Sequence, residues 1–347
     1  MSTLRILGMM AGIMLFLLSF RIFRGQKWNR FNFILFAGSG IFLTAVSLSP
    51  DLIDVLQRTF ALEGAERGRL LALLILAVTV LWFALILTRA SFLKYMYQFD
   101  RLVRAVSIER YRDRIERHLS GCRAAVLIPA LNEEHNLREV LPKIPKKIDD
   151  LKIGVVVVDD GSDDDTYGCS VAAGAFAVRS PINRGGGAAL RIGYDILQKA
   201  DVEICITMDA DGQHNPEEIP VLLAPLMEDR CDIVIGSRIL GAREKDSLFR
   251  LAGVYFFSFI INRLTGLKIT DPSSGFRAFK MDVVRRIPLD EDQFHTSELI
   301  INAAKGGFRI CEAPVTILKR KYGKSKKGRD WLYGLNFAKI VIRSWWR

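Results

Sequence analysis

Two carboxylates, Asp209 and Asp211, are the residues of this 347-residue chain whose type and spacing most directly indicate chemistry. They occupy alternate positions just after the apolar segment 204–208, where a buried strand is expected to leave a sheet. Carboxylates placed there can hold a hard divalent cation, which can in turn hold a diphosphate. The pair alone also fits a less specific interpretation, because acidic residues commonly end strands and segment 215–218 has the composition of a helix N-terminus.

The segments around this pair predict an α/β domain. From residue 123 onward, short β-rich runs alternate with helical stretches, and the runs are apolar enough to be buried on both faces of a sheet. Polar clusters follow most of these runs, and in open α/β sheets ligands bind at the carboxyl ends of the strands. The predicted strands are 124–129, 152–159, 175–179, 203–209 and 232–237, and the clusters are Asn132-Glu133, Asp159-Asp160, Asp209 with Asp211, and Arg238.

Each cluster has a binding interpretation and a structural one. Asn132 and Glu133, after a turn at Pro129, can face a base or ribose or can cap the next helix. Asp160 can accept hydrogen bonds from a nucleobase or a ribose hydroxyl. The glycine-rich segment 183–187 can turn its amides toward a phosphate or can simply form a tight loop. It is not a G-x-G-x-x-G fingerprint, which argues against a nicotinamide enzyme.

A set of motifs in fixed order spans residues 123–327. The motifs are P-A-L-N-E-E (129–134), V-V-D-D-G-S-D-D (157–164), N-R-G-G-G-A-A-L (183–190), D-A-D-G-Q-H (209–214), G-S-R (236–238), D-P-S-S-G-F-R (271–277) and R-K-Y-G-K-S-K (320–326). With these motifs the chain resembles the family-2 glycosyltransferases, and within them the dolichyl- and polyprenyl-phosphate sugar synthases. It departs from their pattern at Gly186, where relatives often carry Lys, and at Ser273, where they often carry Met.

The resemblance implies a Rossmann-like GT-A glycosyltransferase domain that binds a nucleotide-sugar together with Mg²⁺ or Mn²⁺. The implied catalytic residues are Asp211, Asp271 and Arg320, and Asp271 could equally cap the turn that follows it. The implied metal ligands are Asp209, Asp211 and Gln213. The implied donor-binding residues are Pro129, Asn132, Glu133, Asp160, Asp209, Asp211, Gln213 and Arg238, and the implied lipid-phosphate-binding residues are Arg238, Arg320, Ser325 and Lys326.

The implied reaction is an inverting transfer of the sugar to the phosphate of a polyprenyl lipid, undecaprenyl or dolichyl phosphate. A phosphate monoester is already largely anionic at neutral pH, because its second pKa is about 6, so it needs positioning more than a general base. Two other interpretations stay open: transfer to a lipid or glycan hydroxyl, and a membrane scaffold that keeps the fold without turnover. The sequence lacks the T-E-D and Q-x-x-R-W motifs of processive polysaccharide synthases.

Three apolar runs, 6–20, 31–48 and 70–88, predict three transmembrane helices within residues 1–90. The loop between the first two runs is rich in Arg and Lys, so the N-terminus is expected on the outer side and the catalytic domain in the cytoplasm. Residues 91–120 then predict an amphipathic stalk along the membrane surface, because apolar residues recur at three- and four-residue spacing beside many basic ones. A helix packed against the soluble domain is the alternative.

Two further segments are expected to meet the membrane surface. Segment 249–264 is aromatic but too short to span, and 328–347 combines an apolar strip with Trp and cationic residues. Most of the formal charge of +11 lies nearby, since residues 305–347 hold twelve Lys and Arg against two acids. We interpret both segments as interfacial helices, with core packing as the alternative. No nucleic-acid-binding signature accompanies the basic tail, so nucleic acid is not an expected partner, while a homo-oligomer stays open.

The five cysteines show no C-x-x-C spacing, and several fall inside predicted strands. We therefore expect all of them to be reduced core residues of a cytosolic domain. The four histidines have no partners at metal-ligand spacing and are interpreted as structural.

Overall fold

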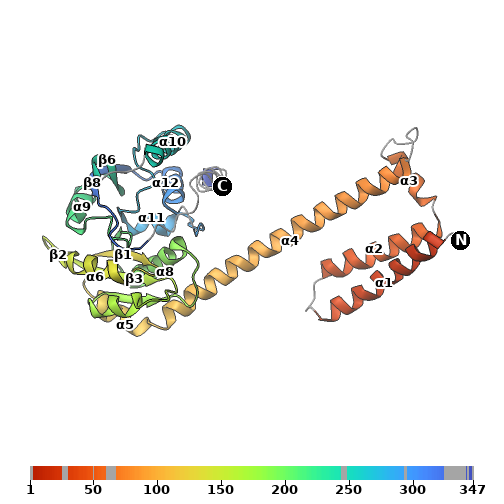
Figure 1. Ribbon diagram of the computed structural model, residues 1–347, viewed down its shortest axis with the longest axis horizontal. Helices are drawn as coiled ribbons and strands as arrows, with labels where there is room; N and C mark the ends of the chain where they lie inside the picture. The colour runs from red at the N-terminus through yellow and green to blue at the C-terminus, as the bar shows by residue number, and fades with distance from the viewer. Residues whose placement is uncertain are drawn as a thin grey trace. The chain divides into compact units, whose positions relative to one another are not determined.

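The computed structural model describes residues 3–25, 30–49, 51–59, 68–243, 248–292, 295–323, 341, 344 and 345. It separates into two compact units, Met1–Met96 and Tyr97–Arg347, and each is described by itself. Helix α4 (Gly68–Glu109) begins in the first unit and ends in the second (Figure 1).

The first unit is helical and contains α1 (Thr3–Gly25), α2 (Arg30–Leu48), α3 (Leu52–Thr59) and most of α4. Helices α1 and α2 approach closely at Gly12 and Gly40. A side-chain carbon on Gly12 would lie 2.8 Å from the carbonyl oxygen of Gly40, and one on Gly40 would lie 2.7 Å from that of Gly12. Small residues at a helix contact are typical of packing in lipid, where close backbone contact replaces the hydrophobic effect.

The membrane prediction is confirmed in part. Within the residues described, α4 is the one helix that is both long enough and apolar enough to cross a membrane, while α1 and α2 hold the shorter apolar segments Arg5–Phe20 and Phe33–Leu48. Three membrane crossings therefore stay a prediction. The residues of the expected stalk form the end of α4 and α5 (Arg112–Leu119). Ile108, Ile115 and Leu119 are buried in the core of the second unit, which agrees with the alternative of a helix packed against the soluble domain, while contact with the membrane surface stays a prediction.

The second unit is built on an eight-stranded sheet in the order β2-β3-β1-β5-β7-β6-β8, with β4 also paired to β3. Strands β1, β3, β4 and β5 are parallel, β7 is antiparallel to β5 and β6, and β8 is parallel to β6. The carboxyl ends of β1, β3, β5, β6 and β8 therefore lie along one edge. The strands are β1 (Ala124–Ala130), β2 (Lys147–Ile148), β3 (Leu151–Asp159), β4 (Phe176–Arg179), β5 (Ile204–Thr207), β6 (Ile233–Arg243), β7 (Arg277–Lys280) and β8 (Ile310–Ile317).

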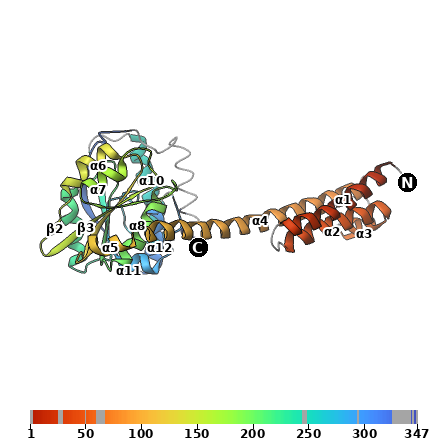
Figure 2. The same ribbon diagram turned by 90° about the horizontal axis from the view of Figure 1, so that it is seen from below.

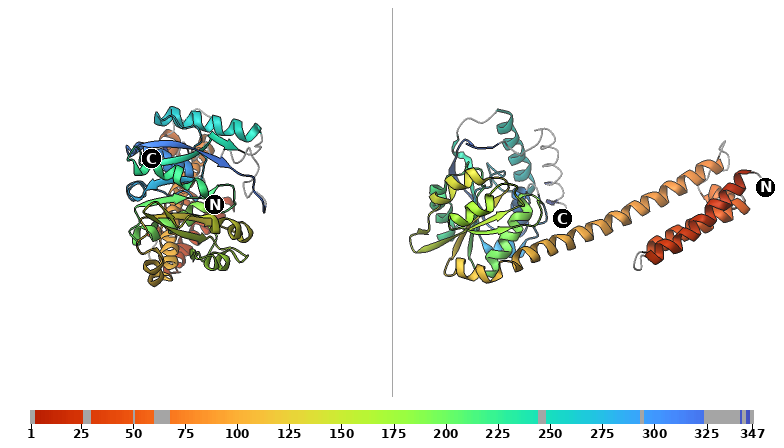
Figure 3. Two further views of the ribbon diagram at one scale, coloured as in Figure 1. Left: turned by 90° about the vertical axis from the view of Figure 1, so that its left-hand side faces the viewer. Right: turned by 60° about the horizontal axis from the view of Figure 1, so that its bottom comes forward.

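Helices cover both faces of this sheet (Figure 2). Alternate strand residues point to opposite faces, so Leu127 of β1 enters the core under α5, α8, α11 and α12, and Ile128 enters the core under α6 and α9. Figure 3 shows α10, drawn in teal, along the outside of the unit. The remaining elements are α6 (Glu134–Val140), η1 (Leu141–Lys143), α7 (Thr166–Ala172), α8 (Gly186–Lys199), η2 (Pro216–Glu218), α9 (Ile219–Met227), α10 (Leu248–Thr265), α11 (Met281–Arg286) and α12 (His295–Lys305).

The α/β fold class and the five predicted strands are confirmed, with ends shifted by a few residues. Strands β2, β7 and β8 were not predicted. β6 continues six residues past its predicted end, and its register with β8 shifts between Ser237 and Ala242, so Arg238 lies at an irregularity of the ladder.

The expectation that all cysteines are reduced is wrong for two of them. Cys231 and Cys311 form a disulfide, whereas Cys122, Cys169 and Cys205 are buried and free. The disulfide partners are 80 residues apart in sequence, but one lies just before β6 and the other on its neighbour β8. Because the pairing of β6 and β8 brings the two cysteines together, no short-range spacing in the sequence predicts this disulfide.

Close packing of α8 on the sheet gives a test of this fold. A side-chain carbon on Gly193 of α8 would lie 2.2 Å from Cδ1 of the fully buried Leu127 on β1. We expect Gly193→Ala to lower the free energy of unfolding by about 1–3 kcal/mol, because the core must shift to make room for the added methyl group. Denaturant unfolding of the full chain in detergent measures this. Gly253→Ala is the control, since nothing lies within 4 Å of that position in α10; equal stability of the two variants would contradict the packing described.

Candidate active site

Asp209 and Asp211 lie in the loop after β5, at the carboxyl edge of the sheet. The backbone N–H of Asp209 donates to Nδ1 of His214 at 3.1 Å, and the N–H of Gln213 donates to Oδ1 of Asp211 at 3.1 Å. Gly212 has a φ of +74°, a left-handed conformation that turns the chain back on itself. These contacts fold the D-A-D-G-Q-H segment into a compact turn that fixes the backbone of both aspartates.

The chain just after β8 pairs with this turn. The N–H of Leu318 donates to the carbonyl of Gln213 at 2.8 Å, and Nε2 of Gln213 donates to the carbonyl of Leu318 at 3.2 Å. His214 and Ile317 form an isolated antiparallel bridge beside them. Because Arg320 follows two residues after Leu318, this pairing brings its side chain to the acidic turn.

Arg320 lies between two acidic side chains. Its Nη2 donates to Oε1 of Glu133, its Nη1 is 3.7 Å from Oδ2 of Asp211, and its Nε donates to the carbonyl of Tyr322 at 2.8 Å. Glu133 is buried, and its second oxygen accepts from Asn136 at 2.7 Å. Arg320 and Asp211 therefore face each other, and Glu133 anchors Arg320.

The electrostatics of this turn fit a divalent cation. Burial, and after it the charge of Asp209, raise the pKa of Asp211, and a bound cation would relieve both effects. The side chain of Asp209 is 50% exposed, so it can reach an external ligand. Within the described ranges, no group of three or more His, Cys, Asp and Glu side chains is placed to hold a metal ion. A cation here would therefore take further ligands from Gln213, substrate phosphate or water, as Mg²⁺ commonly does.

Asp271 is buried and forms an ion pair with Arg238, which is half-buried. Its Oδ2 accepts from Nε of Arg238 at 2.6 Å, and its Oδ1 accepts from the hydroxyl of Ser273 at 3.0 Å. Glu312 of β8 fixes the same loop by accepting from the N–H groups of Thr270 and Asp271, each at 2.9 Å. Asp271 thus holds its turn and orients Arg238, while its catalytic role stays a prediction.

Arg277 is a residue of this region that sequence reasoning missed. It lies at the start of β7 and is buried. Burial lowers the pKa of Arg277 to about 10, so the guanidinium is still charged at neutral pH. Its guanidinium fixes the D-P-S-S-G-F loop by donating to the carbonyls of Pro272 at 2.8 Å, Ser274 at 2.7 Å and Thr296 at 2.5 Å.

Asp160, just after β3, is bound by the glycine-rich loop that precedes α8. Its carboxylate accepts from the backbone N–H of Arg184 at 3.1 Å and from that of Gly185 at 2.6 Å. Burial raises the pKa of Asp160 to about 6, and these two hydrogen bonds oppose the rise. The loop amides are therefore directed at a carboxylate of the chain.

Asn132 connects the loops that follow β1 and β3. Its N–H donates to the hydroxyl of Ser162 at 2.9 Å, and its Oδ1 accepts from the N–H of Asp163 at 2.7 Å. Pro129 lies within β1, opposite Val158 of β3. Both residues shape the same rim as Asp160.

The predicted site residues thus fall into three groups. Asp209, Asp211, Gln213, Glu133 and Arg320 come together, Asp271 pairs with Arg238, and Pro129, Asn132 and Asp160 belong to the adjoining loops. Ser325, Lys326 and most of the helix expected over 328–347 lie outside the described residues.

Two further supporting residues were missed for different reasons. His214 stacks on Phe276, with ring centroids 5.1 Å apart, and accepts the N–H of Asp209. Its place at the end of the D-A-D-G-Q-H motif was an available signal. Glu312 lies on a strand that was not predicted, so nothing in the sequence indicated its role.

Comparisons with known proteins agree with this architecture. The profile of a family described as "Glycosyl transferase family 2" matches residues 125–288. The chain is 30% identical over 219 residues to the polyprenol monophosphomannose synthase of Mycolicibacterium smegmatis, an overlap of 59% of this chain and 80% of that protein. It is 29% identical over 223 residues to the UDP-N-acetylglucosamine–dolichyl-phosphate N-acetylglucosaminyltransferase of Methanococcus voltae, covering 58% of this chain and 88% of that one.

A solved structure shares the fold. The glucosyl-3-phosphoglycerate synthase from Mycobacterium tuberculosis, in complex with Mn²⁺, UDP-glucose and phosphoglyceric acid, matches with a TM-score of 0.53 over 67% of this chain and 82% of that one. The two sequences are 21% identical, so the likeness concerns the fold alone.

The cation site can be tested through Gly275. A side-chain carbon there would lie 2.6 and 2.8 Å from the two carboxylate oxygens of Asp209. We expect Gly275→Ala to displace that carboxylate and to weaken Mn²⁺ binding in the presence of UDP by about 10- to 100-fold, the usual cost of disturbing the surroundings of a metal ligand. Electron paramagnetic resonance titration of Mn²⁺ measures it, with Gly253→Ala as the matched control, because nothing lies within 4 Å of that position. Wild-type affinity in a folded Gly275→Ala protein would contradict the assignment.

Proposed function

We propose that this chain, which belongs to glycosyl transferase family 2, transfers a sugar from a nucleotide diphosphate-sugar to the phosphate of a polyprenyl lipid. The names of two relatives specify polyprenol and dolichyl phosphate products or acceptors, which supports this substrate class. The observation that carries the proposal is the placement of Arg320 3.7 Å from Asp211 at the carboxyl edge of the sheet. The carboxylate of Asp211 is suited to bind a metal ion that carries the donor diphosphate, and the adjacent guanidinium of Arg320 is suited to bind a phosphate.

On the donor side, we assign the diphosphate and a Mg²⁺ or Mn²⁺ ion to the turn that contains Asp209, Asp211 and Gln213. Such an ion, when bound, offsets the negative charge that develops on the leaving diphosphate. Asp160 and Asn132 take the nucleoside, because they follow β3 and β1, and β1 lies next to β5, whose loop holds this turn. The ion's charge also favours the ionised form of Asp211 despite its burial.

Pro129 and Glu133 have indirect roles in this assignment. Pro129 shapes the strand end from which Asn132 projects its oxygen. Glu133 holds Arg320 through a charge-assisted hydrogen bond and thereby sets the guanidinium beside Asp211. Both are therefore positioning residues.

On the acceptor side, Arg320 and Arg238 bind the lipid phosphate, and Ser325 and Lys326 contribute further hydrogen-bond donors. A guanidinium can grip two phosphate oxygens at once, which aims the third at the anomeric carbon. That oxygen forms the new bond as the bond to the nucleotide diphosphate breaks, and the anomeric configuration inverts. The carboxylate of Asp271 accepts from Arg238 and Ser273, and in this proposal it serves the transfer by orienting Arg238.

The outer face of α10 supports a lipid acceptor. Three aromatic side chains are largely exposed there: Tyr255 at 53%, Phe256 at 58% and Phe259 at 68%. The opposite face is buried, so the helix is already packed on one side and leaves an aromatic patch on the other. We propose that this patch lies in the membrane interface.

We further propose that α1, α2 and α4 insert into the membrane, with the N-terminus on the outer side and the catalytic unit in the cytoplasm. The apolar segments of all three helices and the basic loop between the first two support this orientation. The helix expected over 328–347 joins α10 at the membrane surface in this proposal.

Product analysis of an Asp211 variant tests the proposed function. Full-length protein in vesicles is given a panel of labelled nucleotide-sugars, undecaprenyl or dolichyl phosphate, and Mg²⁺ or Mn²⁺. We expect an acid-labile lipid-phosphate sugar from wild type, no product with EDTA, and a rate at least roughly 10²-fold lower for Asp211→Asn, because one preorganised charge is lost. Asp282→Asn, at an exposed ion pair of α11, is the control. An acid-stable glycoside, no product from any donor, or full activity of Asp211→Asn would each contradict the proposal.

The role of α10 is tested by removing its aromatic rings. We expect Phe256→Ser/Phe259→Ser to raise the KM for polyprenyl phosphate in vesicles by roughly tenfold while the donor KM is unchanged, because apolar burial in the interface is lost. Initial rates at varied lipid content measure this. Val221→Ser, at an exposed apolar position on α9, is the matched control. An unchanged lipid KM in the double variant would exclude α10 from the interface.

A further inference from the structure

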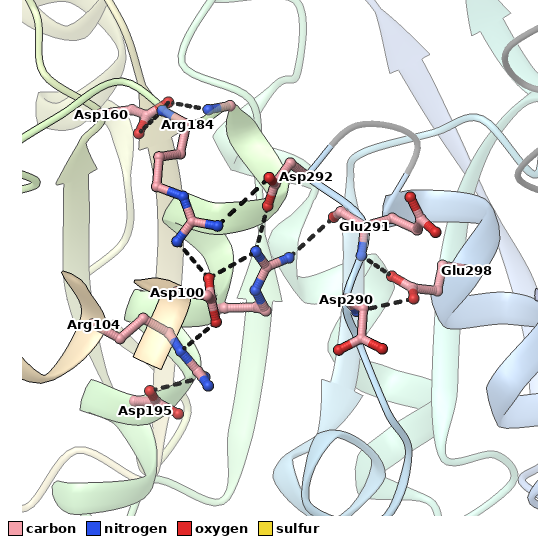
Figure 4. Close-up of polar contacts among 11 residues, drawn as sticks. Asp100, Arg104, Asp160, Arg184, Asp195, Asp290, Glu291, Asp292 and Glu298 are labelled. Atoms are coloured by element: carbon pink, nitrogen blue, oxygen red, sulfur yellow. Dashed lines mark hydrogen bonds and ion pairs between the residues drawn. The ribbon is translucent and has the colours of Figure 1, made fainter. Parts of the chain in front are cut away.

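A buried cluster of alternating charges lies where the end of α4 meets the catalytic unit (Figure 4). At its centre is Asp100, which is 8% exposed. Its carboxylate accepts from Nη1 of Arg184 at 2.5 Å and from Nη2 of Arg191 at 3.0 Å, and Nε of Arg104 lies 3.0 Å away. One carboxylate of α4 thus pairs with an arginine of α8 and with one of the loop before it.

Asp292 closes the cluster from the opposite side. Arg191 donates to its Oδ1, and Nη2 of Arg184 is 3.6 Å from its Oδ2. Its backbone carbonyl accepts from the N–H of Gly187 at 2.8 Å. The two guanidinium groups are therefore held between two carboxylates, one on α4 and one in the segment before α12.

Arg184 links this cluster to the proposed donor site. Its side chain is bound by Asp100, while its backbone N–H, together with that of Gly185, binds the carboxylate of Asp160. Around it the chain reads Asn183-Arg184-Gly185-Gly186-Gly187, and three consecutive glycines contribute no side chains that could fix the loop by packing. The Arg184 side chain, which is 9% exposed, is therefore a principal anchor of these amides.

The buried position of the Arg184 side chain depends on the negative charge of Asp100. A buried guanidinium that loses its carboxylate partner keeps the cost of burial without the compensating attraction, so it moves toward water. Without Asp100, Asp292 would be the one remaining carboxylate of this cluster that faces both Arg184 and Arg191. Asp292 lies farther from Arg184 than from Arg191, so Arg184 would be the more weakly held of the two. The loop would follow Arg184 outward, and the amides would leave Asp160.

We propose that Asp100 is a positioning residue for donor binding, which acts by fixing Arg184 so that the amides of Arg184 and Gly185 stay on Asp160. The proposal rests on the donor role assigned to Asp160 under the proposed function. Asp100 lies outside residues 125–288, the part of the chain that matches the family profile. The end of α4 is thus a working part of the donor site, contributed by the segment that precedes the family domain.

Loss of the hydrogen bonds from these amides to Asp160 should change the pH dependence of donor turnover in one direction. Burial raises the pKa of Asp160 to about 6, the amides of Arg184 and Gly185 oppose the rise, Asp292 adds to it, and the Arg184 charge lowers it. If the amides withdraw, the pKa of Asp160 rises further, so its ionised form is lost at higher pH. The acidic limb of kcat/KM for the donor should then move to higher pH.

Kinetics of Asp100→Asn in full-length protein in proteoliposomes test the proposal. We expect the donor KM to rise roughly 10- to 100-fold, the scale of a small misplacement of binding groups, with the lipid KM unchanged. We also expect the acidic limb to shift upward and Asp100→Glu, which keeps the charge, to recover much of the loss. Glu109→Gln removes the same charge at an exposed ion pair of α4 and is the matched control.

The outcomes separate this proposal from the proposed function. Sugar transfer by wild type together with a wild-type donor KM and pH profile in Asp100→Asn would overturn the positioning role alone. No transfer by wild type from any donor would instead overturn the proposed function. If Asp100→Asn does not fold, Arg184→Met supplies the test, because it removes the anchor without leaving a buried charge unpaired; an unchanged donor KM in that variant would also overturn the proposal.

Discussion

The constraint on which the site depends is that two aspartates, two residues apart, must be held at one sheet edge although they repel each other. Asp211 is half-buried next to Asp209, and partial burial together with the charge of Asp209 raises its pKa. The backbone makes the arrangement possible: the turn closes on His214, and the pairing of Gln213 with Leu318 locks it to the chain after β8. The same pairing brings Arg320, a compensating charge, to Asp211.

Arginines organise the rest of the site, each by a different contact. Arg320 is set by Glu133, Arg238 by Asp271, and Arg184 by Asp100. Arg277 instead binds three backbone carbonyls and fixes the loop next to Asp209. In the proposed function, the first two meet phosphate, while the others hold the loops that meet the donor. A carboxylate partner orients each phosphate-facing guanidinium before a ligand arrives, which lowers the entropy cost of binding.

The sequence predicted what is local and left out what is long-range. Strand runs and the polar clusters after them are read from neighbouring residues, and the parallel sheet then places those clusters along one edge. The contact of Arg320 with Glu133 joins residues 187 positions apart, and the disulfide joins residues 80 apart. Asp100 belongs to an expected stalk, where nothing in the pattern distinguished a buried carboxylate from a solvated one. The sequence pattern places Glu133 among the donor-binding residues, because it gives no sign that Glu133 contacts the distant Arg320.

The structure of the full chain with Mn²⁺ and a nucleoside diphosphate, with the metal located by its anomalous scattering, tests the central claim most directly. We expect the ion between the diphosphate and the carboxylate of Asp211, with Asp209 beside it and Arg320 on the side open to the acceptor. Metal and diphosphate bound away from the D-A-D-G-Q-H turn, with neither Asp209 nor Asp211 beside the ion, would contradict it.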